Sequence, residues 1–103
     1  MSRAVRTPLA RRDLKEIGVH IAAESGSRDL ALRFLSVISR KIATYATRPE
    51  LGERRLDLGA EVRCFPVGRY VVFYRRHKRG IEVLRVLHAS RDIPSVWRTR
   101  ADE

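Results

Sequence analysis

The chain has 103 residues, of which 44% are hydrophobic and 33% are charged. That balance excludes a disordered chain and is typical of one globular domain, which we expect to span 1–103 with a C-terminal tail from about 94 to 103. The formal net charge is +10, from 22 Lys and Arg against 12 Asp and Glu. Such a surface attracts anions, whether nucleic acid, an acidic protein or a membrane face.

The cysteine content and the hydropathy of the chain indicate its cellular location and limit the kinds of site it can form. Cys64 is the only cysteine, so an intramolecular disulfide is impossible and a cysteine-based zinc site would need other ligands. A lone thiol suits a reducing cytoplasm. No apolar segment follows the N-terminal charges, and no run approaches ~18 apolar residues. We therefore expect a cytoplasmic protein with no membrane contact, no metal and no cofactor.

The first half of the chain predicts two helices. Thr7 can cap a helix that begins at Pro8. Ser25–Ser27 ends that helix and begins a second one, whose apolar stripe runs from about 28 to 47 and stops before Pro49. The apolar face of the first helix consists of Ala10, Leu14, Ile17, Ile21 and Ala22. A short connection between two long helices predicts an antiparallel hairpin.

The second half predicts strands. Runs rich in β-branched and aromatic residues cover Val62–Val67, Tyr70–Arg76 and Ile81–His88, and a short strand near Arg3–Arg6 precedes the first helix. The order is β-α-α-β-β-β. It predicts an α+β fold in which the helical hairpin packs on one face of a small antiparallel sheet.

Both faces of the last two strands are apolar, which a sheet with one free face does not show. Because two helices cover one face, a partner chain is the simplest occupant of the other. By strict alternation, the side chains that share a face are Tyr70, Val72 and Tyr74; Val71 and Phe73; Leu84 and Val86; and Ile81, Val83 and Leu87. The rings of Tyr70 and Tyr74 are expected to pack inward and leave their hydroxyls in water.

Four motifs follow one another along the chain. They are Ala10-x-x-Asp13-Leu14-x-x-Ile17, Pro49-x-x-Gly52, Arg63-x-Phe65-Pro66-Val67-Gly68-x-Tyr70-Val71-Val72-Phe73-Tyr74, and Ile81-Glu82-Val83-Leu84-Arg85-Val86-Leu87-His88-Ala89-x-Arg91-Asp92-Ile93. Together they resemble a ParE toxin of the ParE/RelE superfamily of type II toxin–antitoxin modules. The resemblance covers residues from about 3 to 97 and implies the same helical hairpin on a sheet.

The resemblance also implies a partner, a ParD-type antitoxin. The N-terminal part of such antitoxins is a ribbon-helix-helix DNA-binding dimer, and their C-terminal segment folds only on binding the toxin. An acidic, amphipathic segment would complement both the arginine-rich surface and the extra apolar face of the sheet. DNA would then be bound only indirectly, through the antitoxin.

Toxins of this superfamily act in one of two ways. RelE-like members cleave mRNA on the ribosome, and ParE-like members poison DNA gyrase without being hydrolases. RelE-like chains resemble one another in an Arg after the Tyr of the third strand and a Tyr near the C-terminus. Here Val71 follows Tyr70, no Tyr follows Tyr74, and the C-terminal aromatic is Trp97. The resemblance therefore favours DNA gyrase as the target and implies that the chain has no catalytic residues. The alternative is a ribosome-dependent mRNA endonuclease with His88 as base and Arg63, Arg85 or Arg91 holding phosphate.

Two residue sets are candidates for protein contacts. For the antitoxin they are Arg11, Lys15, Arg33, Arg40, Arg63, Tyr70, Arg85 and Leu87, and for the target they are Arg91, Trp97, Arg98 and Arg100. Structural roles compete with several of these. Arg85 can lay its stem over the sheet, Trp97 can tuck onto the sheet, and Arg91 can pair with Asp92. Arg63 can tie strands together or pair with Glu61 or Glu82.

Direct nucleic-acid binding is the third class, supported mainly by charge. The two helices are too long for a helix-turn-helix. The basic turn 75–80 reads either as a solvated hairpin tip or as a contact for an acidic antitoxin, the target or DNA.

Overall fold

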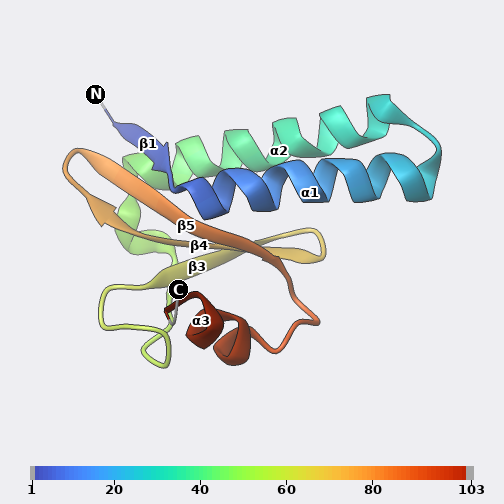
Figure 1. Ribbon diagram of the computed structural model, residues 1–103. Coiled ribbons are helices and arrows are strands. Elements are labelled where there is room, and N and C mark those ends of the chain that lie inside the picture. The colour runs from blue at the N-terminus through green and yellow to red at the C-terminus, as the bar shows by residue number, and fades with distance from the viewer. Residues whose placement is uncertain (1, 102–103) are drawn as a thin grey trace.

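The computed structural model describes residues 2–101, with side chains to residue 97. A five-stranded sheet carries a helical hairpin on one face and a short C-terminal helix on the other (Figure 1). The elements are β1 (Arg3–Arg6), α1 (Pro8–Ser25), α2 (Arg28–Thr47), the 3₁₀ helix η1 (Pro49–Leu51), β2 (Glu53–Arg54), β3 (Arg63–Val67), β4 (Tyr70–His77), β5 (Gly80–His88) and α3 (Ile93–Ala101).

The helical hairpin begins and turns where the sequence predicts. The Thr7 hydroxyl accepts a hydrogen bond from Ala10 N at 3.0 Å, and Pro8 occupies the first helical position. Gly26 takes a left-handed conformation, with φ 68°, that ends α1. Ser27 then caps α2 by accepting from Leu30 N. The two predicted helices are confirmed.

The sheet is mixed, and its strand order is β1-β5-β4-β3-β2. Strand β1 pairs with β5 in parallel, while the other pairs are antiparallel. The prediction of a wholly antiparallel sheet is therefore wrong at this edge. Periodicity identifies a strand but does not encode its direction beside a distant neighbour. Here Gly80 lies so close to β1 that a Cβ would overlap the carbonyl of Arg3.

The main core lies between the hairpin and the sheet. Tyr45 of α2 stacks on Phe65 with ring centroids 3.9 Å apart. Tyr74 is fully buried beneath α2 and η1, where its hydroxyl donates to the Pro49 carbonyl at 2.7 Å and accepts from Gly52 N at 2.8 Å. The expectation of a wet Tyr74 hydroxyl is thus wrong, because backbone groups replace the water.

A bulge in β5 changes which side chains face the helices. Phe73 pairs with Arg85 but Tyr74 pairs with Val83, so Leu84 is an extra residue in the strand. The β4 faces follow the predicted alternation. In β5 the prediction fails after the bulge: Val83 and Val86 pack with the helix-side core, and Leu84 and Leu87 pack on the opposite side.

The second face of the sheet is covered by the chain itself. Its buried residues pack with the partly buried Leu58, Val96 and Trp97 from the 55–62 segment and α3. The buried set is Val62, Cys64, Phe73, Leu84, Leu87 and Ile93. A partner chain is not needed to cover this face, so that expectation is wrong. The segment read as a polar tail folds as a helix whose apolar side chains lie on the sheet.

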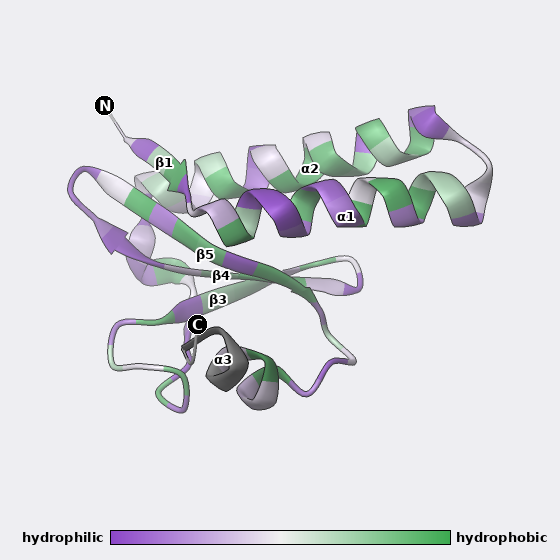
Figure 2. Ribbon diagram, in the orientation of Figure 1, coloured by the Kyte–Doolittle hydropathy of each residue, from purple (hydrophilic) through white to green (hydrophobic). Residues whose placement is uncertain are grey.

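Hydropathy follows these layers. In Figure 2 the strand β5 is mostly hydrophobic with isolated hydrophilic residues, and hydrophilic and hydrophobic residues alternate along α1. None of the helices in residues 2–101 combines the length and hydropathy needed to cross a membrane.

Candidate functional site

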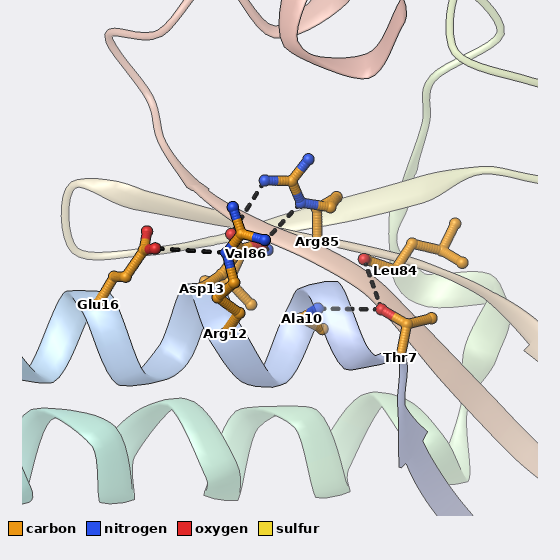
Figure 3. Close-up of polar contacts among 8 residues, drawn as sticks. All are labelled: Thr7, Ala10, Arg12, Asp13, Glu16, Leu84, Arg85 and Val86. Carbon is orange, nitrogen blue, oxygen red and sulfur yellow. Dashed lines mark hydrogen bonds and ion pairs between the residues drawn. The ribbon is translucent and has the colours of Figure 1, made fainter. Parts of the chain in front are cut away.

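A buried ion pair joins α1 to the bulge of β5. Arg85 Nε lies 2.8 Å from Asp13 Oδ2, and its second terminal nitrogen lies 3.0 Å from Oδ1 (Figure 3). The side chains are 11% and 8% exposed, respectively. Val86 N also donates to Asp13, at 3.0 Å. Asp13 therefore satisfies a guanidinium and a backbone N–H at once.

Thr7 anchors the other side of the bulge. Its hydroxyl donates to the Leu84 carbonyl at 2.9 Å while it accepts from Ala10 N (Figure 3). The irregular backbone of β5 thus bonds to α1 or its N-cap on both sides of Arg85. Sequence reasoning placed Asp13 only in a motif. Its position on the apolar side of an amphipathic helix, one residue before Leu14, was the signal of a buried carboxylate that needs a cation.

Arg63 ties the edge of the sheet together. Its guanidinium donates to the carbonyls of Gly52 at 2.9 Å and Glu50 at 3.2 Å, so β3 is bonded to the η1–β2 segment. This is the strand-tying alternative. Glu82, the other proposed partner, pairs instead with Arg75 at 2.8 Å.

Of the predicted target-binding set, Trp97 belongs to α3, and Arg91 precedes that helix by two residues. Trp97 packs edge-to-face on Phe73 with ring centroids 5.5 Å apart, which is the tucked alternative. Asp92 does not need Arg91 as a local partner, because its carboxylate accepts from Ser95 Oγ at 2.9 Å and starts α3. Leu87, from the antitoxin set, is buried on this same face. The side chains of Arg98 and Arg100 lie outside the described residues.

The other basic candidates lie on the outside of the hairpin. Arg11, Lys15, Arg33 and Arg40 are all exposed. Arg33 has only a loose contact with Asp29 at 3.9 Å, and Arg11 donates to the Arg6 carbonyl at 3.3 Å. Such contacts in water contribute little, so these cations are available to a partner.

Exposed apolar side chains accompany these cations. Val19 of α1 is 64% exposed, and Leu30 and Leu32 of α2 are 51% and 54% exposed. A shallow hollow on α1 contains Val19 beside Lys15 and Ala23. Sequence reasoning missed these residues, although apolar residues off the core-facing stripe of a helix were visible in the sequence.

A groove between α1 and the end of β5 holds the remaining candidates. Its lining includes Glu16, His20, Tyr70, His88 and Arg91. The ring of Tyr70 contacts His88 at a centroid distance of 5.2 Å, and burial raises the pKa of the Tyr70 hydroxyl. Ser90 N donates to His88 Nδ1 at 3.1 Å. Of the three arginines considered with His88, only Arg91 lines this groove.

This arrangement of a helical hairpin on a mixed sheet, with a basic outer surface, defines a fold seen in toxin–antitoxin systems. The solved structure described as "Chromosomal ParDE TA system from P. aeruginosa" matches with a TM-score of 0.72 and 21% identity. The match covers 85% of this chain and 96% of that one. At that identity the likeness shows the fold.

The family follows from sequence. The family model described as "ParE toxin of type II toxin-antitoxin system, parDE" matches residues 5–93. The chain belongs to the ParE toxin family, as its motifs indicated, and is the toxin of a ParDE type II toxin–antitoxin system. Membership implies an antitoxin partner of the ParD kind. A comparison with curated proteins found no match.

Proposed function

We propose that this toxin stops growth by binding a protein target, with DNA gyrase favoured, and that it performs no catalysis of its own. The supporting observation is the use of its arginines. RNA cleavage without metal needs a base, an acid and cations that converge on one phosphate. Arg63 is bonded to two carbonyls and Arg85 to Asp13, so two of the three candidate cations serve the fold.

One observation favours the alternative, a RelE-like mRNA endonuclease. His88 and Arg91 share a groove with Glu16 and His20, which are groups able to transfer protons. His88 is held by Ser90 and packed against Tyr70, an arrangement that also suits a structural histidine. The non-catalytic function is the stronger proposal, because it leaves Arg63 and Arg85 in their fold contacts and does not need a base, an acid and cations to converge on one phosphate.

Neutralisation is proposed to occur on the outer face of the helical hairpin. An acidic, amphipathic C-terminal segment of a ribbon-helix-helix antitoxin would place apolar residues on Val19, Leu30 and Leu32. The cations that would rim such a segment are Arg11, Lys15, Arg33 and Arg40. Tyr70 would extend the contact at the start of β4, while Arg63, Arg85 and Leu87 would support the surface from within.

The target is proposed to meet the toxin near α3, through Arg91 and Trp97 together with Arg98 and Arg100. Residues 1–103 would act as one toxin domain in the cytoplasm, where gyrase works. The complex with antitoxin would bind its promoter through the antitoxin's DNA-binding dimer.

The decisive experiment separates target from chemistry. The toxin is expressed alone and with the neighbouring upstream reading frame, and growth arrest relieved by that neighbour is expected. Purified toxin is then added to a gyrase supercoiling and cleavage assay and, in parallel, to ribosomes translating mRNA. Inhibition of gyrase with intact mRNA supports the proposal. Cleaved mRNA that is abolished by His88→Ala, with antitoxin binding retained, would replace it with the endonuclease.

A further inference from the structure

The β4–β5 turn and the start of β1 form a groove in which three of the five lining residues are Arg or Lys. Its residues are Arg3, Val5, His77, Lys78 and Arg79, and we call this site the hairpin groove. Arg3 N donates to the Arg79 carbonyl at 3.3 Å, which fixes β1 against the turn. The turn lies at one end of the sheet beside the N-terminal strand (Figure 1).

The positive charge of the hairpin groove is not offset nearby. Within residues 2–97, no carboxylate lines the groove, and Arg3, Lys78 and Arg79 are exposed without an ion-pair partner. Glu82 is the only acid in residues 70–88, and Arg75 already holds it at 2.8 Å. Three unpaired cations therefore converge on one concave surface.

Lys78, in the β4–β5 turn, has a backbone conformation that favours glycine. Lys78 has φ 47° and is the only non-glycine residue with positive φ in the described part of the chain. It lies in a two-residue turn between the paired residues His77 and Gly80. Such turns favour Gly or Asn in the left-handed position, because a Cβ there is strained. Strain of this kind points to a use for the side chain it carries.

The chemistry of the hairpin groove fits phosphates better than an acidic peptide. A segment that folds on binding needs apolar anchors, and the large exposed apolar side chains among the described residues lie elsewhere, on α1, α2 and the 51–56 segment. No Phe, Tyr or Trp lines the groove, so single-stranded bases would find no such ring for stacking. Forked guanidinium donors match phosphate oxygens, and a two-stranded ribbon fits the major groove of a duplex.

We propose that the hairpin groove binds the phosphate backbone of duplex DNA through Arg3, Lys78 and Arg79. The toxin would then contribute its own DNA contacts rather than reaching DNA only through the antitoxin. The groove shares no lining residue with the candidate contact sites on the helical hairpin and near α3, so the inference stands whether or not gyrase is the target.

The test is the salt dependence of DNA binding by the full-length chain. Fluorescence anisotropy with a labelled random-sequence DNA duplex gives the slope of log K against log salt. The triple variant Arg3→Gln, Lys78→Gln, Arg79→Gln is compared with Arg12→Gln, Arg28→Gln, Arg69→Gln, which loses the same charge elsewhere on the surface. If each groove cation meets one phosphate, the slope should flatten by about 3 in the groove variant and much less in the control.

Further arms keep the result decisive. Lys78→Gly relaxes the turn and removes one cation, so it should fold at least as well and flatten the slope by about 1. A duplex RNA and polyglutamate serve as competitors, and both should compete more weakly than DNA. Equal losses in the two triple variants, unchanged binding by Lys78→Gly, or stronger competition by RNA or polyglutamate would each overturn the proposal.

Discussion

Asp13 and Arg85, 72 residues apart in the chain, form a two-pronged ion pair that holds α1 against the bulge of β5 (Figure 3). Because Asp13 also accepts from Val86 N, one carboxylate fixes both the direction of the Arg85 side chain and the backbone after the bulge. The pair is nearly dry, so its cost of desolvation is offset only while both partners are present.

Asp13→Ala should therefore be among the most damaging substitutions in the chain. It removes the carboxylate shared by the mostly buried Arg85 guanidinium and the buried Val86 N–H, and we expect a loss of about 3–5 kcal/mol in the free energy of unfolding. Urea denaturation measures it. The matched control is Glu16→Ala on the same helix, whose exposed contact with Arg12 at 3.5 Å should contribute less than about 0.5 kcal/mol.

Replacing the ion pair with two apolar side chains tests whether charge at these positions is needed for stability. The double variant Asp13→Leu, Arg85→Met should be clearly more stable than either single variant, because no unpaired charge remains. A double-mutant cycle measures the coupling. Additive losses would mean that the two side chains act independently and that the geometry of the pair has little energetic weight.

The same bulge marks the limit of what the sequence could predict. Helix boundaries were readable because Thr7, Pro8 and Gly26 act locally, and the strands were readable from their composition. The bulge at Leu84 is a backbone event fixed by distant bonds to Thr7 and Asp13, so alternation failed beyond it. The only sign of the bulge in the sequence was Arg85, a charged residue within an apolar strand.

The sequence analysis missed the C-terminal helix α3 for a different reason. Ile93, Val96 and Trp97 have helical spacing after Asp92, which is a good cap, yet the segment's polarity suggested a tail. Their apolar surface makes sense only beside Phe73 and its neighbours on the sheet. The candidate surfaces were harder still, because exposure of Lys15 or burial of Leu87 depends on packing that composition does not fix.

Tyr74→Phe should destabilise the toxin although it deletes one oxygen. The Pro49 carbonyl and Gly52 N–H lose their partner in a buried place, which should cost about 1–3 kcal/mol. Thermal or urea denaturation measures the change. Tyr45→Phe is the control, since it keeps the stack on Phe65. A neutral effect of Tyr74→Phe would show that water can replace the hydroxyl.

The buried Tyr74 and Cys64 also predict sensitivity to alkali. Burial raises the pKa of the Cys64 thiol above its ordinary 9.0 and the pKa of the Tyr74 hydroxyl above its ordinary 10.0. The unfolded chain loses these protons first as pH rises, so the stability they contribute is complete below about pH 9 and is lost through the folded-state pKa values. Urea midpoints from pH 7 to about 11 should fall above about 9, and Cys64→Ala should move the onset upward. A flat profile would contradict this account.

Trp97 should hold α3 on the sheet. Trp97→Ala removes the edge-to-face contact with Phe73 and uncovers apolar surface, for an expected loss of about 2 kcal/mol, while Trp97→Phe should cost less than about 1. Denaturation curves give both values. Toxicity supplies an independent readout, because loss of growth arrest in a stable Trp97→Phe variant would mean that the indole also contacts the target.

The outer face of the helical hairpin should set the rate at which antitoxin arrives. Reversing two exposed cations with Arg33→Glu and Arg40→Glu should slow association about tenfold or more and flatten its salt dependence, because long-range attraction to an acidic segment is lost. Arg54→Glu with Arg69→Glu changes net charge equally at exposed sites outside the two helices and is the matched control. Stopped-flow or biosensor association rates with purified antitoxin measure both. If both pairs of substitutions slow association equally, the overall charge of the toxin attracts the antitoxin. If only Arg33→Glu with Arg40→Glu slows association, the antitoxin segment docks beside these two residues.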